Sequence, residues 1–456
     1  MSHKKNAKRV FEHDKKLTYC IRTFGCQMNE NDSEKLSGLL KAMGYTYEED
    51  VYKAGLVILN TCSIRENADV RVFGNIGEFK TIKKTNPDLI LAVCGCMMQQ
   101  REIVEKIVKT YKQVDLVFGT HNLHLFPEML NNYLVNGKRM VEVLTDSNTI
   151  IEDLPVDHRY PFKAFITIMN GCNNFCTYCI VPYTRGREVS RQPEKIIAEA
   201  KALAADGCVE ITLLGQNVNS YGNDLGDNIN FAILLRELNT IEKLGRIRFM
   251  TSHPKDLTDD VIDAIADCDK VCKYIHLPIQ SGSTRILKAM NRKYTQADVI
   301  DRVAKIREKI PGIAITTDII VGFPGETEED FEETLKVIKI CEFDSAFTFL
   351  YSIRTGTPAA TMKDQIPEEI KHERLNRSLE ILHEQSLGIN QTYQDQLVTV
   401  LAEEPSRNKA NRLTGRTETG KLVNFAGDPE DIGKIVLVKI TDTKTFSLDG
   451  IKVSQE

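Results

Sequence analysis

The stretch Gly171-Cys172-Asn173-Asn174-Phe175-Cys176-Thr177-Tyr178-Cys179 organises the rest of this sequence. Its three thiols are spaced four and three residues apart, follow the apolar run 162–169, and are named the loop cysteines below. Three thiols this close along one loop can ligate three irons of a four-iron cluster and leave the fourth iron open. A structural zinc site needs a fourth protein ligand, and no Cys or His follows before Cys208. We therefore expect an iron-sulfur site.

The amino-acid composition limits the number of domains, the cellular location and the kinds of partner. At about 150 residues per domain, 456 residues predict about three domains, and 42% apolar residues can fill a core in each. No apolar run approaches the roughly 18 residues of a membrane span, and residues 1–16 lack the apolar segment of a signal peptide. We expect a cytoplasmic protein with no membrane partner and with reduced thiols. A net charge of -5 excludes a uniformly basic nucleic-acid binder, so any RNA contact must come from local patches.

Residues 1–16 form a basic tail that we expect to be flexible, and residues 17–136 form the first predicted domain. Short apolar runs at 17–21, 56–59, 89–93 and 116–118 alternate with helical patterns, which predicts a mainly parallel sheet with helices on its faces. Within a few residues after each of the first three strands comes a cysteine, and these strand-end cysteines are Cys26, Cys62 and Cys96. Because loops at the carboxyl ends of parallel strands meet in one crevice, the three thiols could form a second cluster site.

The remaining cysteines have a simpler interpretation. Cysteine is among the most buried residue types, so we expect core positions for Cys20, Cys208, Cys268, Cys272 and Cys341. Cys94 ends its strand, whereas Cys96 lies beyond Gly95 in the loop, which makes Cys96 the better ligand. From the pattern alone, a second cluster site and a set of buried core thiols both remain open.

The segments around both cysteine sets resemble one known family. Those around the strand-end cysteines are similar to the three cysteine motifs of the methylthiotransferase amino-terminal domain: Thr23-Phe24-Gly25-Cys26-Gln27-Met28-Asn29, Asn60-Thr61-Cys62-Ser63-Ile64-Arg65-Glu66-Asn67-Ala68 and Cys94-Gly95-Cys96-Met97-Met98-Gln99. The loop cysteines and the following Ile180-Val181-Pro182-Tyr183-Thr184-Arg185-Gly186-Arg187-Glu188 resemble the family's radical S-adenosylmethionine (radical SAM) motif. Gln-Met-Asn after the first cysteine and Ser-Ile-Arg-Glu after the second are most similar to the branch that modifies isopentenylated adenosine in tRNA.

This resemblance implies cofactors, a reaction and partners. The cofactors are two four-iron clusters, one on each cysteine set, and two molecules of SAM per turnover. The implied reaction replaces the hydrogen at adenine C2 of an isopentenylated tRNA position 37 by a methylthio group, with SAM cleavage at the first cluster giving the radical and the second cluster carrying the sulfur. The implied partners are the tRNA anticodon stem-loop and a low-potential electron donor; a sulfur or cluster donor protein is a further candidate.

Residues 137–157 are polar and acidic and are predicted to link the first domain to a core at 158–386. Strand-like runs recur at 162–169, 209–214, 247–250, 274–277, 313–321 and 346–351. Helical patterns separate most of them, and two of these helices open with Thr-x-x-Asp at Thr295 and Thr327, the sequence of a capping box. Six such units predict a partial (β/α)6 barrel with the loop cysteines at a strand end, where such barrels carry their active sites.

Other strand ends of this core offer candidate SAM contacts. The residues concerned are Gly215, Gln216 and Asn217 after the second strand, Gln280 and Ser281 after the fourth, and Gly322 after the fifth, together with Tyr178 in the cysteine loop. The resemblance implies that the polar groups hold the amino acid part or the ribose of SAM and that Gly322 and Tyr178 lie on its adenine side. His253 and His276 are candidate bases, although histidines near strand ends are more often structural.

The segment 388–454 changes to a strand pattern. Short strands at 397–401, 422–425 and 435–440, separated by Gly, Pro and Asn, predict a small antiparallel β-barrel that resembles the TRAM domain of RNA-modifying enzymes. A basic segment lies between the first two strands, and its candidate RNA contacts are Arg407, Lys409, Arg412, Arg416 and Lys421. Small barrels with basic loops commonly bind RNA, while a merely solvated hairpin is the alternative.

Three functions remain open at this level. The best supported is methylthiolation of isopentenyladenosine in tRNA. A methylthiotransferase acting on threonylcarbamoyl-adenosine or on a ribosomal protein aspartate would keep both cysteine sets. A non-catalytic iron-sulfur protein that binds RNA would also keep them, but it would form no deoxyadenosine from SAM.

Overall fold

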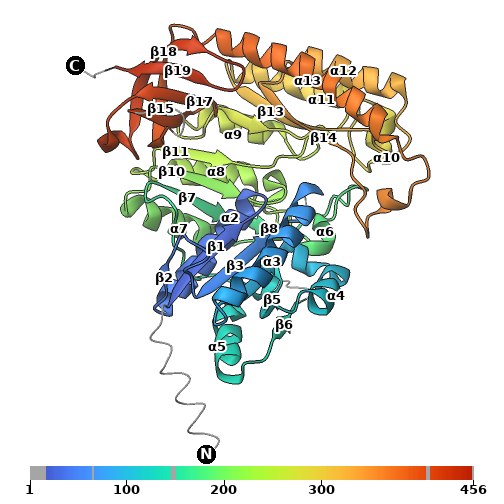
Figure 1. The fold of residues 1–456 in the computed structure, drawn as a ribbon. Coiled ribbons are helices and arrows are strands. Elements are labelled where there is room, and N and C mark those ends of the chain that lie inside the picture. Colours follow the sequence, from blue (N-terminus) through green and yellow to red (C-terminus); the bar gives the residue numbers. More distant parts are fainter. Residues whose placement is uncertain (1–16, 64–65, 145–149, 407–410, 454–456) are drawn as a thin grey trace, which may run out of the picture. The chain divides into compact units, whose positions relative to one another are not determined.

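A computed structural model of the protein describes residues 17–63, 66–144, 150–406 and 411–453. The predicted tail 1–16 and the candidate RNA contacts Arg407 and Lys409 lie outside the described residues. The chain divides into two compact units, of which the first comprises residues 1–159, 169–173 and 179–189 and the second comprises the rest (Figure 1). Among the described residues, no helix is both long enough and apolar enough to span a membrane.

The first unit is built on a six-stranded parallel sheet in the order β2-β1-β3-β4-β5-β6. Its strands are β1 (Thr18–Thr23), β2 (Thr46–Tyr47), β3 (Leu56–Thr61), β4 (Ile90–Gly95), β5 (Leu116–Phe118) and β6 (Met140–Glu142). Its longer helices are α2 (Gln27–Ala42), α3 (Glu66–Thr85), α4 (Arg101–Thr110) and α5 (Phe126–Asn136). The four predicted strands and the parallel sheet are confirmed.

Alternation along the strands gives this sheet two buried faces. Leu56 and Ile58 of β3 pack with α2 and α5, whereas Val57 and Leu59 pack with α3 and α4. Such continuous apolar strands are typical of a parallel sheet covered on both sides. Helices on both faces hold the strands in register, so the loops at their carboxyl ends are fixed together.

The predicted linker 137–157 is not wholly a connection. Met140–Glu142, inside it, pairs in parallel with β5 as the edge strand β6. The pairing of this short strand depends on an edge that only the folded sheet offers.

The second unit contains the six predicted parallel strands: β7 (Lys163–Thr167), β10 (Glu210–Leu214), β11 (Arg246–Phe249), β12 (Tyr274–His276), β13 (Ala314–Val321) and β14 (Ser345–Leu350). They form two three-stranded sheets, β11-β10-β7 and β12-β13-β14. An isolated parallel bridge links Ile247 of β11 to Val271, which precedes β12 in the chain. The predicted partial barrel is thus confirmed as a six-strand core with a weak joint at its middle.

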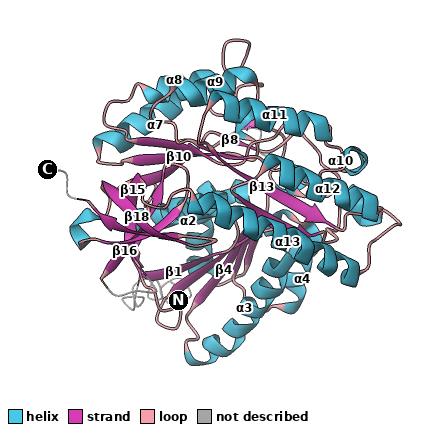
Figure 2. Cartoon of the chain, turned by 90° about the horizontal axis from the view of Figure 1, so that it is seen from above, coloured by secondary structure: helices cyan, strands magenta, loops and turns pink. Residues whose placement is uncertain are grey.

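Helices follow the outside of this core in Figure 2. They are α7 (Pro193–Ala205), α8 (Phe231–Asn239), α9 (Asp259–Asp267), α10 (Thr284–Ala289), α11 (Gln296–Lys309), α12 (Glu328–Cys341) and α13 (Glu368–Gln391). Both predicted capping boxes form, Thr295 with Asp298 and Thr327 with Asp330. The single helix α13 continues to Gln391, so the predicted domain boundary near 387 falls inside it.

The last segment forms a closed five-stranded barrel in the order β15-β16-β17-β19-β18. Its strands are β15 (Leu397–Pro405), β16 (Arg412–Thr417), β17 (Leu422–Ala426), β18 (Ile435–Thr443) and β19 (Leu448–Lys452). The predicted barrel is confirmed, but it is not wholly antiparallel, because β17 and β19 run parallel. An odd number of strands cannot alternate in direction around a closed ring, so at least one neighbouring pair must be parallel.

Two buried arginines of β11 join this barrel to the core within the second unit. Arg246 donates to the carbonyl oxygen of Thr399 at 3.0 Å, and Arg248 donates to that of Thr417 at 2.6 Å. The Arg248 Nε also donates to Glu210 on β10 at 2.9 Å. Buried charges are stable only when they are paired and hydrogen-bonded, so these contacts fix the start of β15 and the end of β16 to the core.

Candidate functional site

The strand-end cysteines converge in the first unit. Cys26 caps the N-terminus of α2, Cys62 follows β3 and Cys96 begins the turn after β4. Gly25 has a φ of +112°, and a Cβ at this position would lie 2.6 Å from the Cys62 sulfur, so only glycine lets these two loops approach. Cys62 and Cys96 contact each other in a buried pair, 0% and 3% exposed.

The surroundings of Cys96 and Cys26 shift the pKa values of these two thiols in opposite directions. The Ser63 N–H donates to the Cys96 sulfur at 3.1 Å. The hydrogen bond from Cys62, with the charge of Arg185 and the Ser63 amide, lowers the pKa of Cys96 from 9.0 to about 6 despite burial. Burial raises the pKa of Cys26, although Arg185 acts against that shift. Only thiolates ligate iron, so a lowered thiol pKa favours metal binding.

Arg185 is a buried cation beside these thiols, and its role could not be predicted from the sequence. Its guanidinium donates to Asp32 at 2.9 Å and to the Asn29 side-chain oxygen at 3.0 Å. The Asn29 amide nitrogen donates in turn to the carbonyl oxygens of Phe24 and Thr61, each at 2.8 Å. Burial opposes the charge of Arg185, but Asp32 and the thiols raise its pKa. Asn29 thus ties the Cys26 loop to the end of β3, and Arg185 holds Asn29.

The donor set fits an iron-sulfur cluster better than a bare metal ion. Across the described ranges, no three His, Cys, Asp or Glu side chains surround one point as ligands of a single ion would. A cubane cluster takes each thiolate on a different iron, so its ligands stand further apart. Cys94 is fully buried in the core beside α2, and burial raises its pKa well above 9.0. Three convergent thiols, a buried cation and glycine-permitted loop approaches therefore suit a cluster with one open iron.

The loop cysteines lie in a tightly held segment. In the first unit, Gly171 has a φ of +79°, and the Cys172 N–H donates to the Gly186 carbonyl oxygen at 3.1 Å. In the second unit, Thr177 donates through its N–H to the Met290 carbonyl oxygen and through its hydroxyl to that of Ala289, both at 3.0 Å. The conformation of this loop is therefore fixed by backbone contacts.

A second buried arginine, also not predicted from the sequence, contacts one of the loop cysteines, Cys176. Arg292 is 7% exposed, and its Nη1 donates to the Cys176 sulfur at 3.3 Å. Its other nitrogens donate to the Pro278 carbonyl oxygen at 2.7 Å and to the Tyr294 hydroxyl at 2.6 Å. The Arg292 guanidinium therefore places a positive charge against the sulfur of Cys176, a candidate cluster ligand. Each cysteine set thus has its own buried guanidinium.

Unpaired polar atoms gather where β10 and β11 end. The buried oxygens of Gln216, Asn217 and Ser252 have no hydrogen-bond partner within the described part of the chain. The Asn217 amide nitrogen donates to Asp256 at 2.7 Å, and the Val218 N–H donates to the Thr251 carbonyl oxygen, which joins the two loops. Buried polar atoms without partners are rare in native proteins and indicate a bound ligand or water. These atoms suit the polar end of SAM.

The other candidate SAM contacts differ in what they offer. Gln280 is buried with a φ of +70°, and its backbone bridges to β13 at Ile319. Ser281 is almost fully buried and its hydroxyl accepts from the Ser283 N–H at 3.2 Å, so this side chain shapes its own turn. Tyr178 packs against an apolar cluster that contains Met290 and Phe323.

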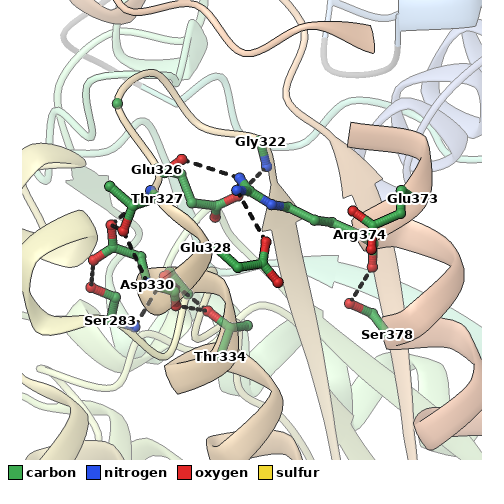
Figure 3. Close-up of polar contacts among 12 residues, drawn as sticks. Ser283, Gly322, Glu326, Thr327, Glu328, Asp330, Thr334, Glu373, Arg374 and Ser378 are labelled. Atoms are coloured by element: carbon green, nitrogen blue, oxygen red, sulfur yellow. Dashed lines mark hydrogen bonds and ion pairs between the residues drawn. The ribbon is translucent and has the colours of Figure 1, made fainter. Parts of the chain in front are cut away.

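Gly322 is held by a buried ion pair, which Figure 3 shows. Its N–H donates to the Glu326 carboxylate at 2.7 Å, and Arg374 of α13 donates to the same oxygen at 2.8 Å. Burial raises the pKa of Glu326 from 4.5 to about 7, although the Gly322 N–H and Arg374 lower it. The turn after β13 is therefore held by the carboxylate of Glu326, four residues after Gly322, and by the guanidinium of Arg374 on α13.

The two candidate bases, His253 and His276, already have polar partners within the protein. His253 accepts at Nδ1 from the Lys255 N–H at 3.2 Å, and burial lowers its pKa to about 2, so this ring is neutral. His276 is buried, with Nδ1 at 2.9 Å from the Thr316 hydroxyl and Nε2 at 3.4 Å from Asp318.

The described basic side chains of the barrel differ in their exposure to solvent and in their ion-pair partners. Arg416 on β16 is 48% exposed along its side chain. The Arg412 side chain is 24% exposed and lies 3.0 Å from the Asp449 carboxylate. Lys421 is only 10% exposed and lies 2.7 Å from Asp344 of the core, so its ammonium serves to hold the barrel in place.

Comparisons with known proteins identify the family of the chain. Family models match at residues 18–119 (Uncharacterized protein family UPF0004), 166–338 (Radical SAM superfamily) and 391–453 (TRAM domain). The chain is 58% identical over 442 residues to the tRNA-2-methylthio-N(6)-dimethylallyladenosine synthase of Clostridium tetani, which covers 97% of this chain and 98% of that relative. It is 57% identical over 448 residues to the protein of the same name from Alkaliphilus oremlandii, covering 98% and 95%.

Among solved structures, the fold is similar to that of the radical S-adenosylmethionine methyltransferase TsrM from Kitasatospora setae. The TM-score is 0.55 at 17% identity, and the match covers 75% of each chain. At this identity the similarity concerns the fold alone.

Proposed function

Because the chain belongs to the family of tRNA-2-methylthio-N(6)-dimethylallyladenosine synthases, we propose that it inserts a methylthio group at C2 of N6-isopentenyladenosine at tRNA position 37. The identity across nearly the whole chain carries this conclusion. It favours isopentenyladenosine over threonylcarbamoyl-adenosine or a ribosomal protein aspartate, and an enzyme over a non-catalytic iron-sulfur protein. The reaction is a group transfer that uses radical SAM chemistry.

The two cysteine sets have separate tasks in this proposal. The loop cysteines hold the cluster that binds SAM, and the strand-end cysteines hold the second cluster. When bound, these cofactors supply the one-electron chemistry that an unactivated carbon-hydrogen bond requires and the sulfur that replaces it. Two molecules of SAM are consumed in each turnover.

The chain's own residues bind, orient and balance charge. Arg292 places a positive charge against Cys176, and Arg185 places one beside Cys26 and Cys96. The unpaired oxygens of Gln216 and Asn217 are available to the polar end of SAM, and the ion pair of Glu326 with Arg374 sets the turn of Gly322.

The C-terminal barrel supplies the contact with the tRNA anticodon stem-loop in this proposal. Phosphate contacts from basic side chains give affinity without sequence information. Arg416 is the most exposed of the described candidates, and Arg407 and Lys409 belong to the same basic segment. We place the reaction in the cytoplasm with a low-potential electron donor, and a sulfur or cluster donor protein completes the set of partners.

Nucleoside mass spectrometry of tRNA from a deletion strain tests this function. The methylthiolated nucleoside should disappear and isopentenyladenosine should accumulate, and the gene supplied on a plasmid should restore the product. An unchanged nucleoside profile would contradict the proposal, as would loss of a modified peptide instead.

A further inference from the structure

Strand β14 of the six-strand core carries two exposed aromatic rings. Phe347 and Phe349 are 57% and 41% exposed, whereas Ile319 and Val321 of the neighbouring β13 are fully buried. Large apolar side chains that share one exposed face mark a contact surface more often than a solvated one.

The register of the sheet shows which residues share this face. Asp318 and Ile320 of β13 are the direct partners of Phe347 and Phe349. Side chains alternate between the faces of a sheet, so partners in a parallel ladder project from the same face. The two phenylalanines, Asp318 and Ile320 therefore form one surface, and the buried Ile319 and Val321 belong to the opposite one.

This surface leads to the loop cysteines. Ile320 packs against the apolar cluster of Ile286, Met290 and Phe323, and Tyr178 of the cysteine loop packs against the same cluster. Thr177, beside Tyr178, donates to the Met290 carbonyl oxygen. The row from Tyr178 through Ile320 to Phe349 therefore joins the cysteine loop to the two rings, with all its contacts inside the second unit.

A polar edge adjoins the rings. His276 lies edge-on to Phe347, with ring centroids 6.2 Å apart. Its Nε2 is 3.4 Å from the Asp318 carboxylate, whose side chain is 25% exposed. This carboxylate can accept a further hydrogen bond from a ligand that lies against the rings.

We propose that Phe347 and Phe349 form an aromatic wall that receives the isopentenylated adenine, and that Asp318 accepts the hydrogen bond of its N6–H. This inference rests on the function proposed above. The substrate base is a flat purine with a branched apolar arm, and both parts match exposed aromatic faces. The single N6–H of the base is a hydrogen-bond donor, and the Asp318 carboxylate is a hydrogen-bond acceptor.

The same groups explain a choice between related substrates. An adenosine whose arm carries a carboxylate would bring a negative charge to apolar rings and to Asp318. Placing like charges together and desolvating one against apolar surface both disfavour binding. The wall therefore selects an apolar arm over an acidic one.

The experiment measures dissociation constants for two anticodon stem-loop RNAs, which carry either isopentenyladenosine or plain adenosine at position 37. The protein is the full chain with both clusters and SAM but without reductant, so no turnover occurs. The variants are the double changes Phe347→Ala with Phe349→Ala and Phe347→Leu with Phe349→Leu. Ile340→Ala, at a 47% exposed position on α12, is the matched control.

Wild type should bind the isopentenylated RNA more tightly than the plain RNA. The double Ala variant should bind the isopentenylated RNA about tenfold more weakly or worse, with the ratio of the two constants near one. The double Leu variant, which keeps apolar surface, should keep part of that ratio, and Ile340→Ala should keep all of it. In a separate assay with reductant and without RNA, deoxyadenosine formation at the wild-type rate shows that a variant is folded and loaded.

A wild-type ratio in the double Ala variant would overturn the aromatic wall. The proposed function fails by a different result, namely wild-type protein that does not methylthiolate the isopentenylated RNA once reductant is added. The two failures are therefore distinguishable in one set of preparations.

Discussion

The strand-end cysteines and the loop cysteines are brought together in different ways. The loop cysteines lie within eight consecutive residues of one loop, which bonds to Gly186 and to Met290 hold in place. The strand-end cysteines are separated by whole β–α units and come together only when β1, β3 and β4 pair in register. One site is thus a property of a segment and the other a property of a sheet.

This difference has a physical consequence. A local site loses little when the surrounding fold loosens, because its ligands remain tethered over a few residues. A site assembled from distant loops must close those loops again, which costs conformational entropy. The strand-end set should therefore respond more strongly than the loop set to changes in supporting residues. Substitutions in and around the two sites test this difference.

Removing the loop cysteines should abolish both activities. With Cys172, Cys176 and Cys179 changed to Ala, nothing binds the cluster that positions SAM, so deoxyadenosine and methylthiolated tRNA should both fall below detection. Iron per chain should fall from about eight to about four. Cys20→Ala and Cys94→Ala are the controls, and neither should change the iron count. A variant that still forms deoxyadenosine would contradict the assignment of this loop.

Arg374→Met should destabilise the second unit while sparing the local site. It leaves the buried Glu326 carboxylate unpaired, which should cost about 3–5 kcal/mol in unfolding free energy at pH 8. The pKa of Glu326 is about 7 in the folded protein, compared with the ordinary value of 4.5 that applies to the unfolded chain. The folded protein therefore binds this proton more tightly than the unfolded chain does. As a result, the free energy of unfolding falls as the pH rises from 4.5 to 7. The loss in Arg374→Met should therefore be smaller at pH 6 than at pH 8.

Denaturant unfolding at both pH values measures this effect, and Glu326→Gln should abolish its pH dependence. While folded, Arg374→Met should still cleave SAM. Equal losses at pH 6 and pH 8 would show that Glu326 does not titrate as described.

Asn29→Ala should weaken the strand-end site selectively. It removes the bonds to Phe24 and Thr61 and the acceptor for Arg185. Loss of a residue that orients metal ligands typically costs about 10–100-fold in affinity. After a chelator challenge, Asn29→Ala should retain about four irons and wild type about eight. Asn86→Ala, which removes a side-chain bond elsewhere in the unit, is the control; equal iron loss in both variants would refute the role of Asn29.

The smallest effect concerns RNA. Arg416→Ala should reduce the slope of log affinity against log salt by about one unit or somewhat less. Lys421→Ala should leave that slope unchanged, because its ammonium is paired with Asp344, and should lower stability instead. Changing Arg407, Lys409, Arg412 and Arg416 together should flatten the slope further. Salt titrations of binding by fluorescence anisotropy would measure all three, and a wild-type slope in the quadruple variant would mean that the hairpin is only solvated.

Much of the fold could be predicted because apolar runs and cap residues are local signals. The strands near 56–59 and 116–118 and the capping boxes at Thr295 and Thr327 were predicted from the sequence and are present. The short edge strand β6 and the parallel pair of β17 and β19 were missed, because both depend on neighbours that exist only after folding.

In the candidate site, too, local features could be predicted from the sequence, whereas features that depend on tertiary contacts could not. Spacing along the chain singled out the loop cysteines, but it left the strand-end cysteines open as either ligands or core thiols, and only the resemblance to a family favoured them as ligands. Spacing could not identify Arg185 or Arg292, because nothing in a sequence tells which of many cations will be buried against a thiol. Nor could it show that Lys421, in a basic run, would be buried in an ion pair. Such roles depend on tertiary contacts.

In the proposed mechanism, the strand-end cysteines carry the sulfur and the loop cysteines generate the radical. The most direct measurement uses the variant with Cys26, Cys62 and Cys96 changed to Ala, shown to be folded and to hold about four irons. Deoxyadenosine formation from SAM should continue in this variant, while methylthiolated tRNA should be absent. If that folded and half-loaded protein still methylthiolates tRNA, the division of labour between the two cysteine sets is wrong.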